Sequence, residues 1–123
     1  MLGTYPEIGS SMPALRRFCF LIAPDGTSAP TLSEGKGATV SYSATGKILI
    51  TFAELPKGEF KGALMGTSFS AATALDVQGQ GYNATTGVFT VQYVDYTGAA
   101  AAPSAANANN WLYVELIFGS SSN

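Results

Sequence analysis

The amino-acid sequence predicts an all-β fold, namely an antiparallel β-sandwich or jelly roll of about seven to eight strands. Three observations predict it. Residues Gly37–Leu55 alternate polar and apolar side chains on both sides of a tight turn at Gly46. The same period of two recurs in Val88–Tyr96 and in Trp111–Phe118. Turn signals separate the strands, and no segment has a convincing amphipathic helical period.

The first strand is expected over Leu15–Ala23, where near-continuous apolar residues from Phe18 to Ile22 predict cover on both faces at that end. Cys19 stands between two phenylalanines and is expected to be a small packed side chain, not a nucleophile. A Pro-Asp-Gly turn follows. Thr27–Lys36 is then predicted to form a loop or an irregular edge, because a proline interrupts it.

The hairpin has one face built from regularly spaced apolar residues. These are Val40, Tyr42 and Ala44 in its first strand and Ile48, Ile50 and Phe52 in its second. Gly46 is expected where the turn needs a positive φ. Tyr42 and Tyr93 alternate with the core positions, so both rings are predicted to pack in the core with their hydroxyls at its edge.

The middle of the chain is less regular. Phe60–Thr67 is predicted to be a strand interrupted by glycines, and Ala71–Gln78 a weaker one. A helix over Ser68–Leu75 is the alternative, because alanine-rich stretches tolerate it. Gly79–Asn83 is expected to be a loop, with the glycines of Gly79–Gly81 marking a bulge or a sharp bend.

The C-terminal part contains a long segment and a closing strand. Thr97–Asn110 lacks a periodic face and is expected to be a long loop, whose length indicates a role in contacts. Trp111–Phe118 follows with two largely apolar faces. This pattern predicts a central strand or a strand between subunits.

The predicted organisation is an extended N-terminal arm over residues 1–13, a β-sandwich domain over 14–119 and a polar tail over 120–123. Glycines and prolines prevent a useful strand or helix in the arm. It is expected to be either an unanchored terminus or an arm that docks on a neighbour. Its anchors in the second case would be Leu2, Tyr5, Ile8 and Met12.

Composition limits the function classes. Only 11% of the residues are charged, so the surface is either covered in an assembly or kept wet by uncharged polar side chains. The six basic residues are scattered, and no basic stripe for nucleic acid exists. No apolar run is long enough to cross a membrane, and no secretion signal is recognisable. We therefore expect neither a nucleic-acid nor a membrane partner.

Catalytic residues are also lacking. The chain has no histidine, which excludes Ser-His-Asp and Cys-His arrangements. Asp25, Asp76, Asp95 and Glu115 are isolated in sequence, so a hard-cation site would need them to converge in the fold. We expect no enzyme, no cofactor, and no catalytic or metal-ligating residues.

Aromatic side chains are the remaining candidates for a binding surface. Tyr96, Trp111 and Tyr113 flank the long loop and could serve protein contacts or carbohydrate stacking as well as core packing. With the anchors of the arm, they complete the predicted interface set of Leu2, Tyr5, Ile8, Met12, Tyr96, Trp111 and Tyr113.

Three segments carry a resemblance to a known class of proteins. They resemble segments of small β-sandwich or jelly-roll virion proteins of tailed bacteriophages. The segments are the strand-turn-strand Val40–Phe52, the middle strand Thr86–Val91, and the terminal strand Trp111–Phe118 with its Ser/Asn tail. The resemblance covers roughly Leu15 to the C-terminus and is one of pattern. No site motif of these proteins is matched, so no functional residue is carried over.

The resemblance implies a virion structural protein that is made in the host cytoplasm. The first hypothesis is a capsid decoration (cement) protein, in which a homotrimer binds the major capsid protein or another virion protein and clamps neighbouring shell subunits. Here the arm would contact the shell or a neighbour, and Trp111 and Tyr113 would lie between subunits. The alternative is a receptor- or glycan-binding module of a head fibre or tail. An ordinary cellular adaptor is a third, residual interpretation.

Overall fold

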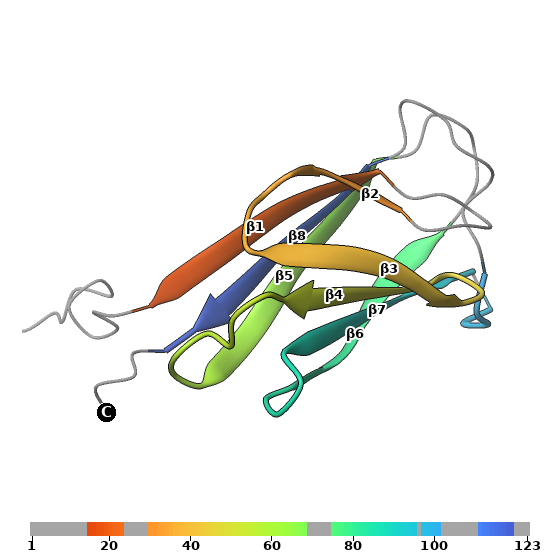
Figure 1. Ribbon diagram of the computed structural model, residues 1–123. Coiled ribbons are helices and arrows are strands. Elements are labelled where there is room, and N and C mark those ends of the chain that lie inside the picture. Colours follow the sequence, from red (N-terminus) through yellow and green to blue (C-terminus); the bar gives the residue numbers. More distant parts are fainter. Residues whose placement is uncertain (1–14, 24–29, 69–74, 96, 102–110, 120–123) are drawn as a thin grey trace, which may run out of the picture.

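The computed structural model describes residues 15–23, 30–68, 75–95, 97–101 and 111–119 (Figure 1). Eight strands and no helix lie in this part of the chain. The strands are β1 (Arg16–Ala23), β2 (Thr31–Glu34), β3 (Ala38–Ala44), β4 (Lys47–Phe52), β5 (Phe60–Ser68), β6 (Asp76–Asn83), β7 (Val88–Val94) and β8 (Trp111–Phe118).

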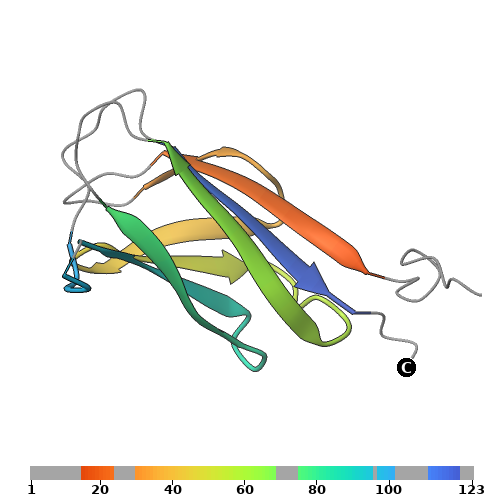
Figure 2. The same cartoon turned by 180° about the vertical axis from the view of Figure 1, so that it is seen from behind.

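The strands form two four-stranded sheets that pack face to face (Figures 1 and 2). The order is β2-β1-β8-β5 in one sheet, here sheet A, and β3-β4-β7-β6 in the other, sheet B. Every pairing between these strands is antiparallel. The predicted antiparallel β-sandwich is therefore confirmed, and β8 is a central strand, as its two apolar faces predicted.

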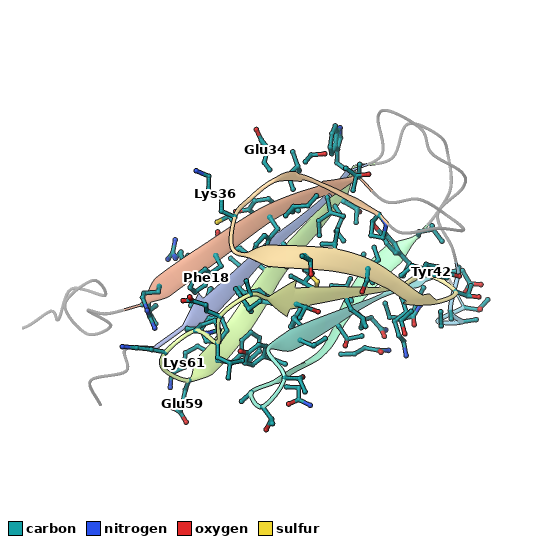
Figure 3. The ribbon with its side chains drawn as sticks, in the orientation of Figure 1. Phe18, Glu34, Lys36, Tyr42, Glu59 and Lys61 are labelled. Atoms are coloured by element: carbon teal, nitrogen blue, oxygen red, sulfur yellow. The ribbon has the colours of Figure 1, made fainter. Side chains whose placement is uncertain are left out.

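The core lies between the sheets and is built by the alternating residues of the four central strands. Twelve hydrophobic residues form one buried cluster, including all inward side chains of β8 from Leu112 to Phe118. Aromatic rings fill the end where β1 begins: Phe52 and Phe118 meet edge to face with centroids 5.8 Å apart. Phe18 points between the sheets and contacts both rings (Figure 3).

Opposite that end, three segments meet at the β3–β4 turn. Gly46 has a φ of +65°, as the turn requires, and its carbonyl accepts a hydrogen bond from Tyr93 N at 2.8 Å. The buried Gln92 amide donates to the carbonyl oxygens of Thr45 at 3.0 Å and Tyr93 at 2.8 Å. Ala101 N also donates to the Tyr93 carbonyl, at 3.1 Å. The turn, the end of β7 and residues 97–101 are thereby held together.

One predicted loop is wrong, and the strand predicted over Ala71–Gln78 is seen only from Asp76, since residues 71–74 lie outside the described residues. Gly79–Asn83 belongs to β6, which begins only at Asp76. The strand passes through these glycines because its register on β7 shifts between Gly79 and Tyr82, and this bulge confirms the predicted irregularity. Residues 69–74, which contain most of the alternative helix, lie outside the described residues.

Two side chains predicted to be packed are exposed. Cys19 is exposed because it points away from the core, on the outward face of β1 between the inward Phe18 and Phe20. Tyr42 is also exposed, at 37%. It lies toward the end of the edge strand β3, where the register shifts between Tyr42 and Ala44, so only one neighbouring strand covers it (Figure 3). The Tyr93 ring, by contrast, is packed in the core as predicted, but its hydroxyl is buried as well and does not lie at the edge of the core.

Candidate interaction surface

The face of sheet A that points away from sheet B carries two of the residues predicted to mediate contacts. This outer face is formed mainly by β1, β8 and β5, whose outward side chains align in rows across the strands. Tyr113 of β8 is paired with Leu21 of β1 on one side and with Gly66 of β5 on the other, and these three residues form one row. Cys19, Glu115 and Leu64 form the next row.

Polar groups are paired around Glu115, whose side chain is only 12% exposed although it lies on the outer face. Its Oε1 accepts a hydrogen bond from the Tyr113 hydroxyl at 2.9 Å and lies 3.6 Å from Cys19 Sγ. Its Oε2 lies 3.7 Å from Arg17 Nε. The hydrogen bonds of the Tyr113 hydroxyl to Cys19 and to Glu115 raise the pKa of Tyr113 well above its ordinary value. Arg17 and Glu115 cancel each other's charge.

An apolar hollow lies beside this polar group. It has a volume of about 340 Å³ and is lined by Leu21, Gly66, Thr67, Trp111 and Tyr113. Gly66 contributes no side chain to this lining, and a Cβ atom added there would meet nothing within 4 Å. Tyr113 is 39% exposed, although large apolar side chains are normally covered on a central strand. The hollow can therefore receive an apolar side chain or a flat ring.

Leu64 protrudes next to the hollow. It is the most exposed large hydrophobic residue in the described chain, at 58%, and it precedes Gly66 by two positions on β5. Residues two apart on a strand point to the same face, so the protruding leucine and the hollow are adjacent on one surface. A contiguous apolar surface of this kind is typical of an interaction site.

A second surface lies at the end of the sandwich where β1 begins and β8 ends (Figure 1). It is a groove of about 640 Å³ whose lining includes Phe18 and Leu55. The lining also carries three of the six cations of the chain and one carboxylate, and we call it the cationic groove. The charged lining residues are Arg16, Lys36, Lys57 and Glu54. The guanidinium of Arg16 donates to the Lys57 carbonyl, which ties β1 to the loop between β4 and β5.

Two kinds of feature are absent from the residues that the structure describes, namely a metal-binding group and a membrane-spanning helix. No three residues among its Cys, Asp and Glu side chains are grouped so that they could hold a metal ion. The described residues also contain no helix that could cross a membrane.

The structure brings two of the seven predicted interface residues together, Trp111 and Tyr113, at the hollow. The other five, Leu2, Tyr5, Ile8, Met12 and Tyr96, lie outside the described residues, as does most of the predicted long loop.

Sequence reasoning missed Leu64 and the charged pair of Arg17 with Glu115. Alternation along β5 could not have found Leu64, because it lies an even number of positions from Phe60, which packs against the core. The register of β5 on β8 shifts between Phe60 and Gly62, so the two side chains end on opposite faces.

No protein-family model, curated protein or solved structure matches the chain.

Proposed function

We propose that this chain is a bacteriophage virion structural protein, a capsid decoration (cement) protein that binds the outer shell and clamps neighbouring capsid subunits. The observation that carries the proposal is the outer face of sheet A. It exposes Leu64 and Tyr113 beside an apolar hollow, and its Glu115 is paired with Arg17 within the chain. Such a face on a rigid sandwich fits burial between the copies of an assembly.

The cationic groove fits the contact with the shell. Arg16 lines it and lies three positions after the end of the predicted arm at residue 13. Arm and groove would therefore approach the shell from the same end of the sandwich. The groove carries three cations and one carboxylate, so an acidic patch on the major capsid protein is the complementary surface.

Particle composition tests this function. Cells that carry the sequence are induced to release particles, which are purified by density and analysed by mass spectrometry. The chain should be present in a fixed ratio to the major capsid protein. A variant that lacks residues 1–13 should be lost from the particles, and Lys36→Glu with Lys57→Glu should lower its amount. Particles without the wild-type chain contradict the proposal.

The second candidate is a receptor- or glycan-binding module of a head fibre or tail. The specific observation in its favour is that Trp111 and Tyr113 line a hollow beside the Glu115 carboxylate. Aromatic faces next to carboxylates are what a saccharide needs for stacking and hydrogen bonding. A glycan array separates the two functions: binding that Trp111→Ala abolishes supports the module, and a folded protein without any binding supports the decoration protein.

A further inference from the structure

We propose that the outer face of sheet A binds a second copy of this chain across a twofold axis, with Leu64 of each copy seated in the hollow of the other. The inference rests on the proposed function only in assigning this face to contacts between copies. The pairing is tested on the purified chain, whereas the proposed function is tested on particles. A chain that stays monomeric would therefore not decide whether it is a virion protein, and its absence from particles would not decide whether it pairs.

The first step is that protrusion and hollow are self-complementary. Leu64 is 58% exposed, and Gly66 leaves open space where any other residue would place a Cβ atom. The two positions lie about 7 Å apart along β5, because a strand rises by roughly 3.4 Å per residue. A surface that carries both the protruding side chain and its receiving site can pair with an identical surface.

The second step concerns the position of the axis. In a face-to-face pair, a twofold axis that runs across the strands at Met65 reverses the direction of β5 in the second copy. Leu64 then lies opposite Gly66, and Gly66 opposite Leu64, which is the reciprocal contact of an isologous interface. The same operation places the row of Glu115 opposite the row of Tyr113, because the rows cross all three strands.

The third step is electrostatic. With this axis no charged side chain of the two central rows faces its own copy: Glu115 lies opposite the phenol of Tyr113, and Cys19 lies opposite Leu21. Arg17 already pairs with Glu115 within each chain at 3.7 Å. Within these rows of β1, β8 and β5, the axis therefore places no like charges directly opposite each other, and such repulsion does not oppose self-association there.

The area of the outer face indicates a weak contact. Three strands of eight or nine residues cover a projected area of about 400 Å² per copy, from a rise of roughly 3.3 Å per residue and a strand spacing of about 4.8 Å. The two copies together would cover about 800 Å², which is below the roughly 1,200 Å² of standard interfaces and fits a weak, transient contact. We therefore expect pairs that dissociate on dilution, with a dissociation constant in the micromolar range.

Sedimentation velocity over about 5 to 500 µM protein tests the pairing, with three variants beside the wild type. Gly66→Val fills the hollow and Leu64→Thr removes the protruding side chain. Each should raise the dimer dissociation constant about tenfold or more, as expected for central interface residues. Leu55→Thr is the matched control, because Leu55 is 53% exposed but lies at the cationic groove; it should leave pairing unchanged.

Loss of folding does not confound the result. Gly66 is not in the left-handed region and has open space around it, so valine fits the monomer and suits a strand. Isotope-filtered NMR on a mixture of labelled and unlabelled chains should detect contacts between Leu64 methyls and the Tyr113 ring of different copies. A monomer at every concentration, a trimer, or a dimer that Gly66→Val leaves intact would each overturn the twofold pairing.

Discussion

The Tyr113 hydroxyl donates a hydrogen bond to Glu115 Oε1 at 2.9 Å, although both residues belong to one strand and lie on the outer face of its sheet. The same hydroxyl lies 3.3 Å from Cys19 Sγ on the neighbouring strand. This link joins β1 and β8 outside the core. It also orients the Tyr113 ring at the rim of the hollow, so the polar and apolar halves of the outer face are coupled.

The first prediction concerns the ionisation of Tyr113. Its phenol should ionise at higher pH than a free tyrosine, whose pKa is about 10, because the hydroxyl is held by Cys19 and Glu115. Glu115→Gln and Cys19→Ala should each lower the pKa of Tyr113 toward its ordinary value. The ζ-carbon shift of labelled tyrosine during a pH titration measures this change.

The matched control is Glu59→Gln, which removes a carboxylate that pairs with Lys61 at the far end of β5 (Figure 3). It should leave the titration of Tyr113 unchanged.

The raised pKa of Tyr113 means that the folded protein keeps the phenol proton after the unfolded chain has lost it. Its contribution to stability is therefore complete below pH 10 or so and declines as the pH rises further.

Gln92 should be a stability determinant. Its amide is buried and donates to the Thr45 and Tyr93 carbonyls, so Gln92→Ala removes both hydrogen bonds, and only the Tyr93 carbonyl keeps another donor, Ala101 N. We expect the free energy of unfolding to fall by about 1–3 kcal/mol, measured by urea denaturation. Gln78→Ala, at the exposed partner position on β6, should change it by less than about 0.5 kcal/mol. Equal effects would contradict the buried role of Gln92.

Two glycines with positive φ should differ sharply in their tolerance of alanine. Gly37 has a φ of +83° and open space around its missing side chain, so Gly37→Ala should cost about 1 kcal/mol from the backbone alone. Gly46 has a φ of +65°, and an added Cβ would overlap the Ala101 carbonyl oxygen. Gly46→Ala should therefore cost about 3 kcal/mol or more in urea denaturation. Similar costs would show that residues 97–101 do not pack on the turn in solution.

Asp95 should make the protein sensitive to acid. Its Oδ1 accepts hydrogen bonds from the Thr97 hydroxyl at 2.6 Å, from Thr97 N at 2.8 Å and from Ala99 N at 3.1 Å, and these donors lower its pKa. The stability from this turn should be present above the unfolded pKa of about 3.9 and be lost as the pH falls through the lower folded value. Asp95→Asn should flatten this acid limb of a stability–pH profile. An unchanged limb would contradict the prediction.

Much of the fold follows from local pattern. The hairpin around Gly46 and the strand Trp111–Phe118 are where alternation places them, because a period of two assigns each side chain to one face of any strand. The errors occur where the pattern is ambiguous. Gly79 and Gly81 resemble loop residues, yet a bulge keeps them in β6, and Tyr42 alternates with core residues but lies near the end of an edge strand.

Alternation and composition alone were enough to predict most of the strands, most of their inward faces and the low charge of the surface. The folded structure was needed to show that Leu21, Tyr113 and Gly66 share a row, that Arg17 neutralises Glu115, and that Leu64 protrudes beside a hollow. Alternation assigns a side chain to one side of its own strand, whereas its neighbours depend on strand order and register. Those are set by the packing of both sheets around one core, through contacts between residues far apart in the chain.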